Sequence, residues 1–83
     1  MEMETRIALI GVIVEDIQSS GEVNEILHES GPHIIGRMGV PYRERGIKII
    51  SVVVDAENDV ISSLAGKLDM VKGIKVKTMY AKN

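Results

Sequence analysis

The polar segment at residues 16–21, with the sequence DIQSSG, is the part of the chain best suited to bind a ligand. It follows a long apolar run and leads into a helical pattern. The start of a helix carries free backbone N–H groups and the positive end of the helix dipole, and both attract anions. We therefore treat this segment as a candidate small-molecule site, which two subunits could share. The alternative interpretation is that it only caps the helix.

Two histidines, His28 and His33, lie close together in the sequence, and Glu25 and Glu29 flank the first of them. Such side chains can bind a metal ion, but a structural transition-metal site usually has about four protein ligands. A histidine near a helix C-terminus and glutamates on a solvated helix face account for the same residues. We predict no metal ion and no other cofactor.

Charged residues near the ends of the apolar runs are further candidates for chemistry. The carboxylates are Glu15, Asp16 and Asp55, and the arginines are Arg37, Arg43 and Arg45. The first set could perform acid–base chemistry, and the second could bind a carboxylate or a phosphate. Solvated strand ends and a solvated turn are the better explanation, because nothing in the sequence places either set in a pocket. No P-loop, dinucleotide-binding glycine motif or Ser–His–Asp order is present, so we expect no enzymatic activity.

The composition excludes several classes of function. The chain has 83 residues, of which 45% are hydrophobic and 27% charged, as in one small globular domain. It has no cysteine, and therefore no disulfide or thiolate metal site. Its net charge of −2 and its lack of Trp and Phe give neither a basic surface nor an aromatic platform, so direct nucleic-acid binding is not expected.

The same features give expectations for domain organisation and location. We expect residues 1–83 to form a single domain with an ordered core at about 6–82. No apolar run approaches the ~20 residues of a membrane span, and the first residues do not resemble a secretion signal. A cytoplasmic protein without membrane contact is therefore expected.

Four segments are predicted to be strands, because they are rich in Ile and Val or alternate between apolar and polar residues. These segments are residues 6–15, 34–42, 47–55 and 74–80. Gly36 and Gly39 interrupt the second of them and predict a bulge or bend. The polar residues 43–46 end in glycine and predict a hairpin tip between the second and third strands.

Two segments have apolar residues at helical spacing. The first helix is predicted to begin at Ser19 or Ser20, whose hydroxyls can cap it, and to stop at residues 31–32, a Gly-Pro pair. The second is predicted to be capped by Asn58 and to end at Gly73. The order strand, helix, strand, strand, helix, strand predicts an α+β, ferredoxin-like βαββαβ fold. Right-handed crossovers would place both helices on one face of a four-stranded antiparallel sheet.

Both faces of the predicted first strand are apolar. One set of side chains is Ile7, Leu9, Gly11 and Ile13, and the opposite set is Ala8, Ile10, Val12 and Val14. The third strand divides in a similar way, and the helices can cover only one of the two faces. A monomer would then expose an unusually large apolar patch, and covering even about 400 Å² of it contributes about 10 kcal/mol before association costs. We predict a homodimer or homotetramer, the alternative being a different protein as partner.

Three segments together resemble a family of small regulators. They are IALIGVIVED (7–16), GRMGVPYRERGIKIISVVVD (36–55) and DVISSLAGKLDMVKGIKVKT (59–78). They resemble the iron-only hydrogenase system regulators, which are stand-alone ACT-like proteins similar to the C-terminal domain of the nickel-responsive repressor. The stretch SGEVNEIL (20–27) also resembles the start of the first helix in ACT domains, the small-molecule regulatory modules. The resemblance covers about residues 6–82.

The resemblance implies an ACT-like fold, an oligomer and a regulatory role. From ACT domains it implies a ligand-binding set of Asp16, Ser19, Ser20 and Gly21. Nickel binding and operator binding are not implied, because the chain has no Cys, only two His and no DNA-binding segment. We therefore expect a non-catalytic module that senses a small ligand or a partner as a homo-oligomer, in the regulation of an iron-only hydrogenase system. A small hydrolase of the acylphosphatase kind and a purely structural interaction domain are the alternatives.

Overall fold

The computed structural model describes residues 4–82, and the strands and helices follow the order βαββαβ. The strands are β1 (Arg6–Val14), β2 (Ile34–Tyr42), β3 (Ile47–Ala56) and β4 (Ile74–Tyr80), and the α-helices are α1 (Ser20–Glu29) and α2 (Asn58–Asp69). Short 3₁₀ helices lie at Ile17–Ser19, Gly31–His33 and Arg43–Arg45. The four predicted strands are confirmed to within one residue at each end.

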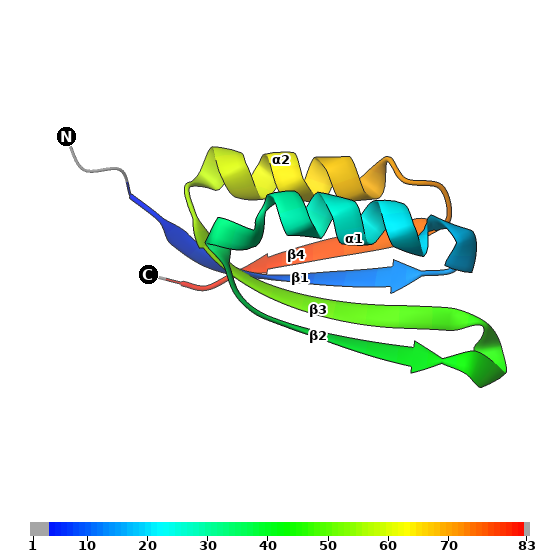
Figure 1. Cartoon of the computed structure of the whole chain (residues 1–83). Coiled ribbons are helices and arrows are strands. Elements are labelled where there is room, and N and C mark those ends of the chain that lie inside the picture. The colour runs from blue at the N-terminus through cyan, green and yellow to red at the C-terminus, as the bar shows by residue number, and fades with distance from the viewer. Residues whose placement is uncertain (1–3, 83) are drawn as a thin grey trace.

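The four strands form one antiparallel sheet in the order β2-β3-β1-β4. β1 is an inner strand, and its Leu9 lies opposite Val53 of β3 and Met79 of β4. Both helices cover the same face of this sheet, which gives two layers (Figure 1). The predicted ferredoxin-like α+β fold is thereby confirmed. β2 pairs with β3 through a register shift between Ile34 and Gly36, which is the bulge that the glycines predict.

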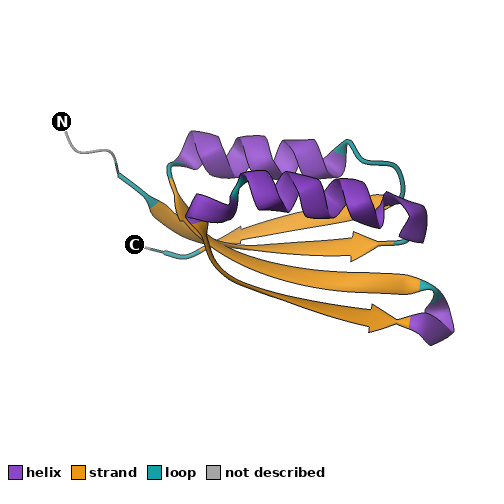
Figure 2. Cartoon of the chain, viewed as in Figure 1, coloured by secondary structure: helices purple, strands orange, loops and turns teal. Residues whose placement is uncertain are grey.

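The hydrophobic core lies between the two helices and the sheet, where the two layers of Figure 2 meet. Alternate residues of the inner strands β1 and β3 point into it, and Ile10 and Val52, which are opposite each other, are fully buried. The helices contribute Val23, Leu27, Ile61, Leu64 and Leu68. Each such side chain contributes about 1.5–3 kcal/mol of hydrophobic free energy to the folded state. Neither α-helix in residues 4–82 has the length and hydropathy to cross a bilayer.

The structure corrects two predictions about helix caps. Ser19 is the N-cap residue of α1, but its side chain makes no cap hydrogen bond. Its backbone is helical, with φ −84° and ψ −2°, whereas a capping side chain is normally positioned by an extended backbone. The N-cap of α2 is Glu57 in an extended conformation, so Asn58 is the first helical residue and does not cap the helix.

Candidate functional site

The predicted ligand-binding loop, residues 16–21, joins β1 to α1 and lies against the turn that precedes β4. The Ser19 hydroxyl donates a hydrogen bond of 2.7 Å to the carbonyl oxygen of Lys72. A Cβ placed on the next residue, Gly73, would lie 2.5 Å from the Cβ of Asp16. Asp16 and Ser19 therefore have structural partners within the chain, and the loop fits closely against this turn.

The other predicted residues of this loop lie at the start of α1. Ser20 and Gly21 form its first turn together with Glu22, whose carboxylate interacts favourably with the helix dipole. The carboxylate of Asp16 accepts a hydrogen bond of 3.0 Å from the backbone N–H of Gln18. The four predicted residues are thus gathered around one helix start, and ligand binding by them stays a prediction.

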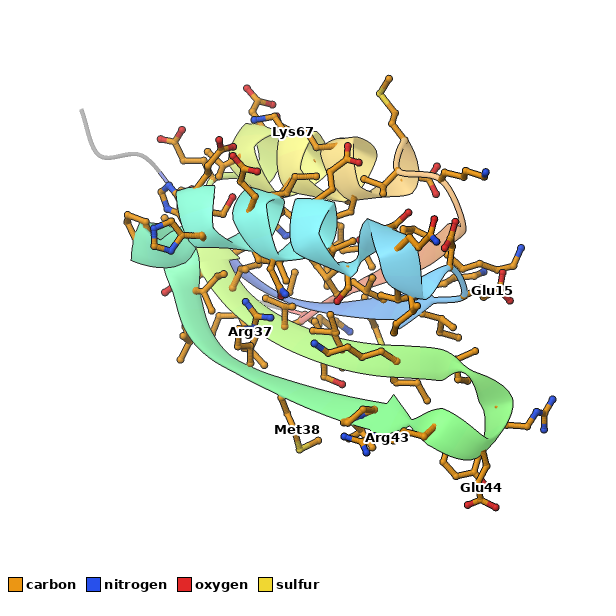
Figure 3. The ribbon with its side chains drawn as sticks, turned by 45° about the vertical axis from the view of Figure 1, so that its right-hand side comes forward. Glu15, Arg37, Met38, Arg43, Glu44 and Lys67 are labelled. Atoms are coloured by element: carbon orange, nitrogen blue, oxygen red, sulfur yellow. The ribbon has the colours of Figure 1, made fainter. Side chains whose placement is uncertain are left out.

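Of the three carboxylates considered for acid–base chemistry, Asp55 lies far from the adjacent pair Glu15 and Asp16. Glu15 directly follows β1, whereas Asp55 of β3 is paired with Ile7 near the other end of β1. At about 3.3 Å per strand residue, these positions are about 26 Å apart. Arg37 points toward α1 (Figure 3) and donates a hydrogen bond of 2.8 Å to the Asn24 side-chain oxygen. These side chains do not form a joint site.

The remaining candidates for anion or metal binding are also dispersed. Arg43 and Arg45 belong to the 3₁₀ helix at the β2–β3 hairpin tip, and Arg43 lies six residues, or about 20 Å, along the strand from Arg37. His28 is in the last turn of α1, and His33 is in the following 3₁₀ helix. Residues 4–82 contain no group of three or more His, Cys, Asp or Glu side chains that could hold a metal ion.

The face of the sheet opposite the helices, called the open face below, is largely apolar. It carries eight large apolar side chains from all four strands, each between 39% and 66% exposed. They are Ile7, Leu9, Ile13, Met38, Val40, Tyr42, Ile49 and Met79. Figure 3 shows the two faces at β2, where Met38 points away from the side that Arg37 occupies. The predicted second apolar face is confirmed.

Two small residues, Gly11 and Ser51, lie side by side in the middle of the open face. Gly11 of β1 is paired with Ser51 of β3 on one side and with Lys77 of β4 on the other. Larger side chains, Ile13 and Ile49, form the next pair along the strands. These five residues line the open-face part of a solvent-open hollow of about 610 Å³, called the central hollow below, whose lining also includes Asp69, Ile74 and Val76 from the helix-covered side beside β4. Its volume falls in the range of about 300–1,000 Å³ found for ligand pockets.

The side chains that line the central hollow carry a net positive charge. Lys75 and Lys77 line it on the open face of β4, whereas Asp69 borders it from the end of α2, on the helix-covered side of the sheet. Two ammonium groups and one carboxylate leave one net positive charge. The acidic residue of β3 on this face, Asp55, is four residues from Ser51, or about 13 Å along the strand.

Sequence reasoning placed Gly11 in one of the two apolar sets of its strand, without deciding which set the helices cover, and did not find the hollow. The cross-strand pairing of Gly11 with Ser51 creates it, and local patterns in a sequence do not give the pairing register. The signal that could have found it is a small residue near the middle of each of two adjacent apolar strands.

The family described as "TM1266-like: Iron-only hydrogenase system regulator, putative" matches residues 6–78. The chain belongs to this family. The uncharacterised protein TM1266 from Thermotoga maritima has a solved structure that is 36% identical to this TM1266-like chain. The match covers 95% of this chain and 100% of that chain, with a TM-score of 0.91. The resemblance inferred from the three sequence segments is therefore confirmed.

Two solved structures of low sequence identity share the fold of the TM1266-like chain. A formyltetrahydrofolate deformylase from Pseudomonas putida KT2440 matches 88% of this chain with 28% of its own, at 14% identity and a TM-score of 0.63. CPII, a nitrogen regulatory PII-like protein from Thiomonas intermedia K12 bound to ADP, AMP and bicarbonate, matches 99% of this chain with 100% of its own, at 12% identity and a TM-score of 0.50. No curated protein matches the TM1266-like chain significantly.

Proposed function

We propose that the chain is a non-catalytic regulatory module that senses a small ligand as a homo-oligomer, in the regulation of an iron-only hydrogenase system. The observation that carries the proposal is the open face, which exposes large apolar side chains on all four strands. The family description supports the regulatory role. The PII-like protein with the same fold holds ADP, AMP and bicarbonate, so this fold is compatible with small ligands in that protein.

The size of the open face fits a second copy of the chain. Four strands about 4.8 Å apart and about nine residues long, at about 3.3 Å each, give a face of about 570 Å². Two copies stacked on this face would bury about 1,100 Å² in total. Specific interfaces bury at least about 1,000 Å², so a second copy is sufficient to cover the exposed apolar residues.

The test of self-association is a charge placed on the open face. In Leu9→Lys, an ammonium group would be buried in the interface of each copy, which should weaken association at least about 100-fold. Met70→Lys is the matched control, because Met70 is 87% exposed and follows α2 on the other side of the sheet. Sedimentation equilibrium should show an oligomer for the wild type and the control and a monomer for Leu9→Lys, with far-UV circular dichroism confirming that all three fold.

Self-association through this face would be contradicted if the wild type sediments as a monomer at micromolar concentration. It would also be contradicted if Leu9→Lys has the same sedimentation mass as an oligomeric wild type.

Ligand sensing is tested separately, by thermal unfolding of the wild type with amino acids, nucleotides and divalent cations. A ligand that binds the folded state raises Tm. The set Asp16, Ser19, Ser20 and Gly21 is our proposed site for such a ligand, and Ser20→Ala should then reduce the shift in Tm. A panel that leaves Tm unchanged would count against sensing of these ligands.

A further inference from the structure

We propose that the central hollow of the open face binds a small organic anion, a single carboxylate on a short hydrocarbon chain, between two copies of the protein. This inference rests on the self-association in the proposed function. It adds a ligand site distinct from the loop at the start of α1, and it names the chemistry of the ligand.

The shape of the hollow suits an apolar body. Gly11 and Ser51 form a low floor, and the walls include the isoleucines Ile13 and Ile49, so most of the lining is apolar. A second hollow of about 260 Å³ on the same face shares Gly11, Ser51 and Lys77 with it. Ligand sites are typically concave and mostly apolar, with a few polar groups that orient the ligand. The Ser51 hydroxyl and the lysines are such groups here.

The net positive charge of the side chains that line the hollow favours an anionic ligand. Lys75 and Lys77 outnumber Asp69 by one charge in its lining. When a second copy covers the face, these ammonium groups lose part of their water, which is costly unless an opposite charge replaces it. Within one chain, Asp55 is too distant to pair with Lys77. It lies about 13 Å along β3 from Ser51, which is in the same cross-strand row as Lys77. One carboxylate per copy of the protein balances the remaining charge of that copy.

The chain offers a substitution that fills the hollow without disturbing the fold. A Cβ on Gly11 would have the Lys77 carbonyl oxygen at 3.9 Å as its nearest neighbour, which is an ordinary contact. Valine also suits a strand, so Gly11→Val should fold normally and occupy the ligand's place. Gly36→Val is the matched control, because a Cβ on Gly36 meets nothing within 4 Å and Gly36 does not line the hollow.

The experiment measures binding of octanoate by isothermal titration calorimetry, with octanamide as the neutral probe of the same shape. The wild type should bind octanoate at least about tenfold more tightly than octanamide, since a charge-assisted contact is lost with the amide. Gly11→Val and Lys77→Met should each weaken octanoate binding at least about tenfold. Gly36→Val should bind within about twofold of the wild type, and so should Lys67→Met, which removes a lysine from α2 (Figure 3).

The outcomes separate this inference from the proposed function. If octanoate and octanamide bind the wild type equally, the anion site is overturned. The same holds if the Gly11→Val variant binds octanoate as the wild type does. If the protein still sediments as an oligomer, self-association stands in both cases. The site is also overturned if the wild type does not bind octanoate and Asp55→Asn weakens self-association. In that case Asp55 of the second copy balances the charge of the lysines. A wild type that sediments as a monomer with and without octanoate overturns both.

Discussion

Replacing Gly73 by alanine should destabilise the protein more than the same change at Gly46. Both glycines have a left-handed backbone, with φ of 74° and 66°, which costs another residue about 1–2 kcal/mol. Their surroundings differ. A Cβ on Gly73 would lie 2.5 Å from the Cβ and 3.1 Å from the backbone nitrogen of Asp16, whereas a Cβ on Gly46 has no neighbour within 4 Å.

The two costs add at Gly73. To accommodate the methyl group, the loop that contains Asp16 must move away from the turn before β4, and comparable overpacking costs about 1–3 kcal/mol. Gly73→Ala should then lower the free energy of unfolding by about 2–5 kcal/mol, whereas Gly46→Ala should lower it by about 1–2 kcal/mol. A domain of this size has a total stability of about 4–12 kcal/mol. At about 4–8 °C per kcal/mol, Tm should fall by at least about 8 °C in Gly73→Ala.

The assay is urea unfolding followed by far-UV circular dichroism, at one protein concentration for all variants. Gly66→Ala is the control, because Gly66 lies inside α2 with nothing within 4 Å of the added Cβ, so helix propensity should stabilise it by about 0.5–1 kcal/mol. The expected order of stability is Gly66→Ala, wild type, Gly46→Ala, Gly73→Ala. Equal losses at positions 46 and 73 would refute the argument, because the close approach of Asp16 would then contribute nothing.

Two further pairs of substitutions test the loop and the core by the same measurement. Ser19→Ala should lower the free energy of unfolding by about 1 kcal/mol, because it removes the hydrogen bond to the Lys72 carbonyl, while Ser20→Ala should change it by less than about 0.5 kcal/mol. Ile10→Ala should cost about 2–5 kcal/mol as a fully buried residue of β1, whereas Ile17→Ala, at 57% exposure, should cost less than about 1 kcal/mol.

Runs rich in Ile and Val, together with the alternation at residues 74–80, were sufficient to predict the strands of the sheet and its two apolar faces. In β1 the alternate residues Ile10 and Val12 are fully buried, while Leu9 and Ile13 are about two-fifths exposed. This division follows from the two-residue period of a strand, which depends on local backbone geometry alone. The bulge in β2 was predictable for a related reason, because glycine in a strand often marks such an irregularity.

Features that depend on distant parts of the chain could not be predicted in this way. The Ser19 hydroxyl was expected to cap α1, but it binds the carbonyl of a residue 53 positions away. The central hollow depends on the pairing of Gly11 with Ser51, 40 positions apart, and the sequence predicted the strands without their register. Gly73 was expected only to end the second helix, and its close contact with Asp16 became evident from the packing of the two loops.

The uneven charge of the open face restricts the symmetry with which two copies can stack. Its β4 side carries Lys75 and Lys77, whereas its β2 side carries Met38 and Val40. A two-fold axis in the plane of the interface and perpendicular to the strands would place β4 over β4 and bring the lysines of both copies together. An axis parallel to the strands places each β4 over the other copy's β2 and keeps like charges apart. Apolar contact is similar in both orientations, so electrostatic repulsion selects the direction of the axis.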